Sequence, residues 1–156
     1  MSTPQARSAI KFDLFADAAR KRKIETLGDP LQIITRHIDF AHLARVVDQL
    51  LPRGDTSKGG RPPYPTEVMV RILVLKHLYN LSDEQAEYQL LDRMSYQRFC
   101  LLTDSVNIPD RNTIWHYQQR LGADGAAALF QALDGQLLRH GYLARSGRII
   151  DAHLVP

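Results

Sequence analysis

Polar side chains that could contact nucleic-acid bases are concentrated on one predicted helix, residues 110–121. Ile114, Tyr117 and Leu121 recur at spacings of three and four, which predicts that they form its inner side. The outer side then carries Arg111, Asn112, Thr113, His116, Gln119 and Arg120. These side chains donate or accept hydrogen bonds and none is acidic, so they could meet base edges and phosphates. The alternative is a plain helical bundle with a polar outer face.

A second candidate is the segment 53–65, which contains three glycines, three prolines and three basic residues. This composition predicts a loop. Arg61, within Gly60-Arg61-Pro62-Pro63, could belong to a stiff basic arm that enters a groove of DNA. The other interpretation is a rigid connector that sets the angle of the next helix, because polyproline geometry needs no ligand.

Other kinds of chemistry find little support in the sequence. Cys100 is the single cysteine, so neither an internal disulfide nor a cysteine-based zinc site is expected. The six histidines are scattered without metal-ligand spacing. The apolar runs are too short to cross a bilayer and the N-terminus does not resemble a signal peptide. We therefore expect a cytoplasmic protein without a membrane partner.

The charge distribution favours a polyanionic partner. The 156-residue chain has a formal net charge of +3, and residues 1–80 hold 13 of its 20 Lys and Arg but only 8 of its 17 acids. The densest basic run is 20–23. A basic excess of this kind is typical of nucleic-acid binding, although a basic run is also common on a solvated helix face.

Apolar periodicity predicts a mainly α-helical chain. Helices are expected over 12–27, 30–51 with a new start at Asp39, 66–79, 83–93, 95–103, 110–121 and 126–140. The helix 66–79 is apolar on nearly every face and should be central. The three helices within 83–121 have the order of a helix-turn-helix unit. We expect residues 1–11 to be a disordered N-terminus, 12–141 to be one helical DNA-binding domain, and 142–156 to begin a further domain with a lone strand near 148–155.

Several segments resemble the N-terminal region of the family-five insertion-sequence transposases. The resemblance rests on Gly60-Arg61-Pro62-Pro63-Tyr64-Pro65, on Leu78-Tyr79-Asn80-Leu81-Ser82-Asp83-Glu84, on Asp92-Arg93-Met94-Ser95-Tyr96, and on Ile108-Pro109-Asp110-Arg111-Asn112-Thr113-Ile114-Trp115. Order and spacing agree over roughly residues 58–156. The family is bacterial, so the resemblance implies a location in the cytoplasm, at the nucleoid.

The resemblance also implies that this region precedes a ribonuclease-H-like catalytic domain with a DDE carboxylate triad. Asp151, within Arg148-Ile149-Ile150-Asp151-Ala152, would be the first carboxylate of that triad and a ligand for Mg²⁺ in a complete enzyme. No acidic residue follows Asp151. We therefore expect this chain to bind no Mg²⁺ by itself and to be catalytically inactive alone.

The leading hypothesis is a module that binds double-stranded DNA, namely the terminal inverted repeats of an insertion sequence, during DNA transposition. One alternative is an oligomerisation or regulatory fragment that inhibits full-length transposase, with subunit contacts through the apolar segments 31–51 and 66–79. Another is a non-functional remnant. The sequence leaves these alternatives open.

Overall fold

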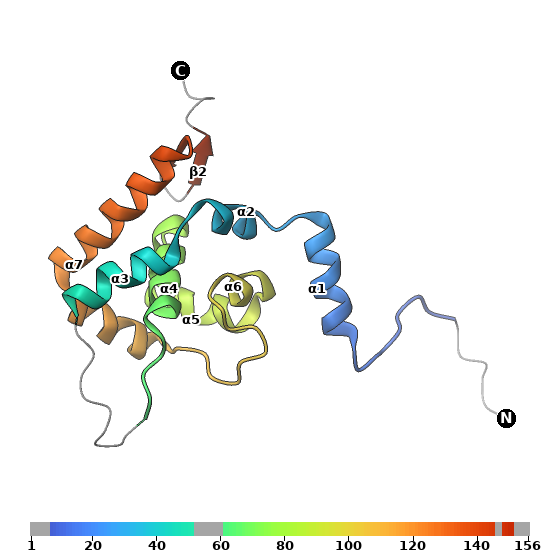
Figure 1. The fold of residues 1–156 in the computed structure, drawn as a ribbon. Coiled ribbons are helices and arrows are strands. Elements are labelled where there is room, and N and C mark those ends of the chain that lie inside the picture. Colours follow the sequence, from blue (N-terminus) through green and yellow to red (C-terminus); the bar gives the residue numbers. More distant parts are fainter. Residues whose placement is uncertain (1–6, 52–60, 146–147, 152–156) are drawn as a thin grey trace.

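The computed structural model describes residues 7–51, 61–145 and 148–151. Its elements are α1 (Ala16–Leu27), α2 (Pro30–His37), α3 (Phe40–Leu50), α4 (Thr66–Tyr79), α5 (Asp83–Asp92), α6 (Met94–Phe99), α7 (Arg111–Arg139), β1 (Tyr142–Arg145) and β2 (Arg148–Asp151). Figure 1 shows their arrangement. The prediction of a mainly α-helical chain is confirmed.

Helix α4 lies at the centre of the helical body, as its composition predicts. It packs against α3, α5 and α7. Its buried residues lie on all sides of the helix and comprise Thr66, Val68, Met69, Val70, Arg71, Ile72, Leu73, Val74, Leu75 and Leu78. Burying a leucine- or isoleucine-sized side chain stabilises a fold by about 1.5–3 kcal/mol, so α4 is the main source of core stability.

Side-chain caps fix the starts of α2, α3, α5 and α7 where the sequence predicts them, and the cap of α7 is Asp110. Asp29 accepts from the backbone N–H of Leu31, and Asp39 accepts from that of His42, each at 3.0 Å. Ser82 and Gln85 form a reciprocal capping box. Each such cap satisfies a backbone donor that the helix itself leaves unpaired.

Helix α7 contains a break that separates two straight segments, residues 111–121 and 123–139. Gly122 has φ 70° and ψ 176°, which is not helical. The two helices predicted at 110–121 and 126–140 are therefore both present, and they follow one another across a kink at this glycine. Glycine adopts a positive φ without the steric cost that a Cβ brings, and it therefore sets the bend.

Helix α1 lies at the edge of the helical body, on the side of α6 (Figure 1). It contains no buried residue. The apolar side chains before it are also exposed, with Phe12 at 96% and Phe15 at 73%. The expectation of a helix from Phe12 is therefore wrong at its start, because these apolar residues find no core to pack against.

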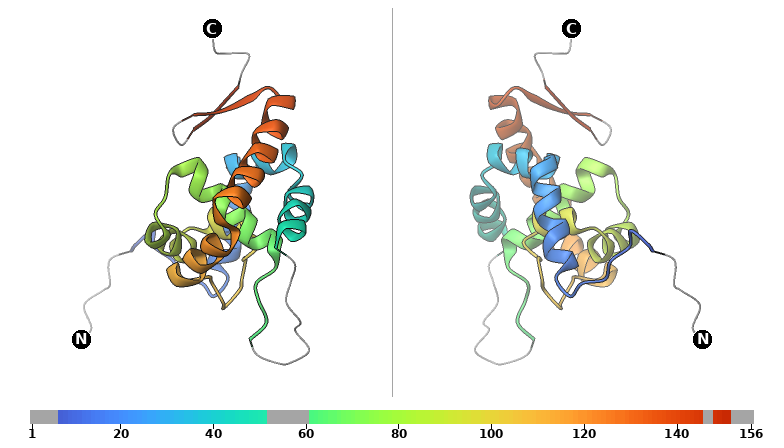
Figure 2. Two further views of the ribbon diagram at one scale, coloured as in Figure 1. Left: turned by 90° about the vertical axis from the view of Figure 1, so that its left-hand side faces the viewer. Right: turned by 90° about the vertical axis from the view of Figure 1, so that its right-hand side faces the viewer.

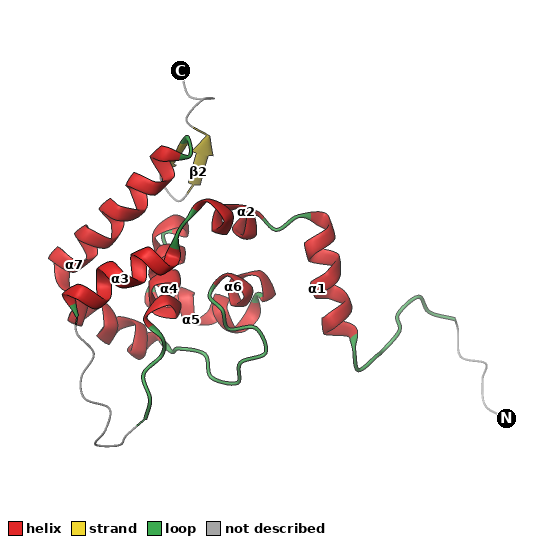
Figure 3. Cartoon of the chain, viewed as in Figure 1, coloured by secondary structure: helices red, strands yellow, loops and turns green. Residues whose placement is uncertain are grey.

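The C-terminal strands form an antiparallel hairpin, drawn in yellow in Figure 3. Tyr142 pairs with Asp151 and Arg145 pairs with Arg148. The expectation of a lone strand is wrong for the described residues, because Gly141, at φ 80°, ends the preceding helix and leaves β1 beside β2. The two strands supply backbone partners to each other. The assignment of this region to the start of a ribonuclease-H-like domain stays a prediction, and residues 152–156 lie outside the described part.

Most apolar side chains of the two segments proposed as subunit contacts, 31–51 and 66–79, are buried in this chain's own core. Leu31, Phe40, Leu43 and Val47 are buried, as is most of α4. Exposed apolar side chains remain at Ile33, Leu50 and Tyr79 within these segments, and at Phe12 and Phe15 before α1. Oligomerisation through 31–51 and 66–79 stays a prediction.

Candidate nucleic-acid interface

The first segment of α7, residues 111–121, presents the predicted polar side chains outward. Ile114 and Leu121 are buried and Tyr117 is half-buried, so the predicted phase of the helix is correct. Exposed positions on the other side are Arg111, Asn112, Trp115, His116, Gln119 and Arg120, and Thr113 is half-buried. An outward ridge of polar side chains is available to a ligand approaching from solvent.

The start of this segment is held by Asp110. Its carboxylate accepts a hydrogen bond of 2.7 Å from the backbone N–H of Thr113. Hydrogen bonds from Thr113, together with the positive charge of Arg61, hold the pKa of Asp110 below its ordinary value. Capping of this kind is a structural role, and it explains the acid beside an otherwise non-acidic ridge.

Arg61 is exposed, and its positive charge is the smallest of the contributions that lower the pKa of Asp110 at the start of α7. Residues 53–60 of the loop lie outside the described part. Residues 61–65 continue directly into α4, which also fits the connector interpretation.

Arg111 differs from the sequence expectation because two glutamates of α5 flank it. Its Nη1 lies 3.1 Å from Oε1 of Glu84, and its Nε lies 3.3 Å from Oε2 of Glu87. The same Oε2 accepts the backbone N–H of Arg111 at 2.9 Å. The expectation of a ridge without acidic neighbours is wrong at Arg111, since packing of α5 against α7 places these carboxylates beside it.

A second polar cluster lies behind the ridge and involves Gln118, which the sequence did not single out. Gln118 Nε2 donates to Asp83 at 2.6 Å, and Lys76 Nζ donates to the Gln118 side-chain oxygen at 3.0 Å. Lys76 and Asp83 also form an ion pair. The cluster links α4, α5 and α7 and fixes the direction of the ridge.

Trp115 adds an aromatic surface to the ridge. Its side chain is 48% exposed, and its ring lies 5.0 Å from that of His116, centroid to centroid, in an edge-on arrangement. The periodicity places Trp115 between the inner and outer faces of the predicted helix, so the sequence does not predict whether its side chain is buried or exposed. An exposed indole suits stacking or van der Waals contact with a ligand.

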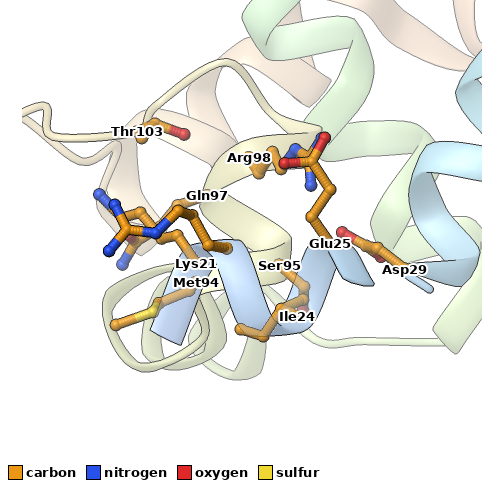
Figure 4. Close-up of a pocket in the computed structure, with 10 residues that line it drawn as sticks. Lys21, Ile24, Glu25, Asp29, Met94, Ser95, Gln97, Arg98 and Thr103 are labelled. Atoms are coloured by element: carbon orange, nitrogen blue, oxygen red, sulfur yellow. The ribbon is translucent and has the colours of Figure 1, made fainter. Parts of the chain in front are cut away.

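A cleft of about 240 Å³ lies between α1 and α6 and carries part of the basic run 20–23 (Figure 4). Its polar walls are already largely paired, since Lys21 contacts Asp104 at 2.6 Å and Arg98 contacts Glu25 at 3.3 Å. Arg20 pairs with Asp17 within α1. Within the run 20–23, Lys21 thus attaches α1 to the segment after α6, whereas Arg22 and Lys23 stay exposed.

Asp151 lies at the end of β2, away from the ridge. Figure 2 shows the hairpin at the opposite end of the molecule from residues 61–65. Over 7–51, 61–145 and 148–151, no group of three His, Cys, Asp or Glu could hold a metal ion. A catalytic or metal-binding role for Asp151 stays a prediction that implies further ligands.

Among the described residues no helix is long and apolar enough to cross a membrane. Residues 19–120 match a family model described as a transposase domain (DUF772), which includes α2 to α6 and most of the ridge. No solved structure matches the chain. Since the match extends over more than half of the 156 residues, the chain belongs to this transposase domain family and has a transposase-related role.

Proposed function

We propose that this chain binds double-stranded DNA through the ridge on the first segment of α7, and that its ligand is the terminal inverted repeat of an insertion sequence. The observation that carries the proposal is the availability of Asn112, Gln119 and Arg120. All three are exposed, and their side chains form no hydrogen bond or ion pair with the described residues. Family membership supports the same partner.

The chemistry of these side chains suits a major groove. A carboxamide such as that of Asn112 or Gln119 can pair with both N6 and N7 of adenine, and Arg120 can contact guanine or phosphate. The major groove of DNA is wide enough to admit an α-helix, and the outward side chains of this segment are exposed to such a ligand. Helices α5 and α6 precede the ridge helix in the order of a helix-turn-helix unit, which supports this orientation.

Arg61 supplies a second contact in the proposal. Its positive charge contributes to the lowered pKa of Asp110, which caps the start of the ridge helix. Phosphates flanking the groove would meet Arg61 at that end and Arg120 near the other. Contacts of this kind set the register of a protein on DNA without reading its sequence.

A gel-shift titration tests the proposal. The probes are a duplex carrying the terminal inverted repeat of the element that encodes the chain and a random duplex of equal length. Affinity for the repeat should exceed that for the random duplex, and both affinities should fall steeply with salt because counterions are released. Absence of binding to either duplex at low salt would overturn the proposal.

Two variants test whether Arg120 on the ridge contributes more to binding than an exposed arginine elsewhere. Arg120→Ala should weaken binding to both duplexes and reduce the dependence on salt by about one counterion if it contacts phosphate. Arg36→Ala is the matched control, because Arg36 is an exposed arginine on α2, which packs against α6. Equal losses in the two variants would show that only net charge matters and that the ridge has no special role.

A further inference from the structure

The three side chains of the Arg111–Glu84–Glu87 cluster differ in their exposure to solvent. The Arg111 side chain is 53% exposed and that of Glu84 is 74% exposed, whereas that of Glu87 is only 22% exposed. Glu87 binds both the Nε and the backbone N–H of Arg111, and Glu84 binds Nη1 alone. Glu87 therefore supports Arg111 through two hydrogen bonds, whereas Glu84 is an exposed neighbour with a single contact.

This charge balance disfavours a phosphate at Arg111. Two carboxylates lie within 3.3 Å of one guanidinium, so the cluster carries a net negative charge when all three groups are ionised. A phosphate approaching Arg111 would meet both carboxylates as well as the cation. A neutral base edge avoids that repulsion while still offering acceptors to the guanidinium.

The free donors of Arg111 match guanine. Glu87 occupies Nε, which leaves Nη2 unpaired among the described residues and Nη1 shared with the exposed Glu84. Guanine presents N7 and O6 as adjacent acceptors in the major groove, and arginine binds them with two parallel donors. Cytosine, in the same base pair, presents its N4 amino group as a donor, which a carboxylate accepts.

We propose that Arg111 and Glu84 together read one G·C base pair in the major groove, with Glu87 as the positioning residue for Arg111. The inference rests on the proposed binding of DNA through this ridge. Arg111 donates from Nη1 and Nη2 to guanine, and Glu84 turns from Arg111 to accept from cytosine N4. An A·T pair presents an amino donor beside N7 of adenine, so it fails to match the guanidinium.

Glu84 also acts against non-specific binding. When no G·C pair is present, its carboxylate stays on Arg111 and adds negative charge to a surface that faces DNA. Like charges at an interface suppress binding to the wrong partner. Removal of this charge should therefore increase affinity for random DNA while it reduces discrimination.

The first experiment selects binding sequences from a random duplex pool with the full chain. The wild type should enrich a site with one G·C pair that Arg111→Ala no longer selects, while the remaining positions of the site persist. Glu87→Gln should weaken the same preference. Glu84→Gln should bind random duplex more tightly than the wild type does, and Arg120→Ala should lose affinity at all sequences without altering the G·C preference.

The second experiment changes single atoms of the selected guanine. Substitution by 7-deazaguanine, which removes N7, should weaken wild-type binding by about tenfold or more and leave Arg111→Ala unaffected. Substitution by hypoxanthine keeps N7 and O6 and removes only the minor-groove amino group, so affinity should be retained. Thermal unfolding checks each variant, and Arg111→Lys, which keeps the charge but loses the two-pronged donor, replaces Arg111→Ala if the latter does not fold.

The outcomes separate this inference from the proposed function. Sequence-specific binding with the same base preferences in wild type and Arg111 variants would overturn the G·C assignment and leave DNA binding intact. Equal wild-type affinity for guanine and 7-deazaguanine would overturn it as well. Absence of any DNA binding would overturn both proposals together.

Discussion

The backbone carbonyl of Phe99 accepts a hydrogen bond of 2.8 Å from Nη1 of Arg71 in the interior between α4 and α6. Arg71 is only 8% exposed, and its guanidinium carbon lies 4.2 Å from the ring centroid of Phe40 on α3. Nη2 reaches Glu67, one helical turn earlier, at 3.4 Å. One buried cation thus connects three helices through a hydrogen bond, a ring contact and an ion pair.

Arg71→Lys should lower the free energy of unfolding by about 1–3 kcal/mol. A lysine ammonium cannot reproduce the planar fork, so the buried carbonyl of Phe99 would lose its donor or the ring contact would be lost. Urea unfolding followed by circular dichroism measures the effect. Arg36→Lys, at an exposed position, should change the midpoint little, and equal midpoints for the two variants would contradict this role.

The sequence predicts the direction of the ridge but not its neighbours. The period of Ile114, Tyr117 and Leu121 is a local property of one helix, so it could be read directly. The glutamates beside Arg111 come from α5, more than twenty residues earlier, and only tertiary packing places them there. The exposure of Trp115 cannot be predicted for a related reason. Its side chain lies between two faces of the helix, and the neighbouring elements decide whether it is buried.

Two other features, the burial of Arg71 and the pairing of the C-terminal strands, could not be predicted from the sequence pattern. Arg71 lies within an apolar helix, and the periodicity does not say whether a single cation there points to solvent or to a buried carbonyl. The strand at 148–151 was expected without a partner because β1 is too short to give an alternating pattern of its own.

Asp110→Ala should destabilise the protein by about 1 kcal/mol at neutral pH, because it removes the cap on α7. The difference between wild type and variant should depend on pH. The folded state holds the pKa of Asp110 below its unfolded value, so the stabilisation is present above the unfolded pKa and is lost as pH falls through the folded pKa.

Thermal unfolding of both proteins between pH 7 and about pH 2 measures this dependence. The two melting temperatures should converge in acid. Asp134→Ala is a suitable control, since Asp134 is an exposed aspartate within the second segment of α7 and does not cap that helix. A constant gap between wild type and Asp110→Ala over the whole range would contradict the capping role of the ionised carboxylate.

Cys100 should be unreactive in the folded protein. Its side chain is fully buried, and desolvation raises the pKa of its thiol far above the ordinary value, so the reactive thiolate is scarce. Labelling with a chromogenic disulfide reagent should be slow in buffer and fast in concentrated urea. Rapid labelling of the native protein at neutral pH would show that α6 opens readily and that the core around Phe99 is not closed.

The bend in α7 predicts opposite effects for two glycine-to-alanine substitutions. Gly122 has a positive φ, where a Cβ introduces strain, so Gly122→Ala should lower the free energy of unfolding by about 1–3 kcal/mol. Gly135 lies within the second segment of α7, and a Cβ there would meet no atom within 4 Å. Gly135→Ala should raise stability by about 0.5–1 kcal/mol, because alanine loses less backbone entropy in a helix. Urea midpoints of the two variants should therefore shift in opposite directions, and a stabilised Gly122→Ala would mean that α7 runs straight through residue 122 in solution.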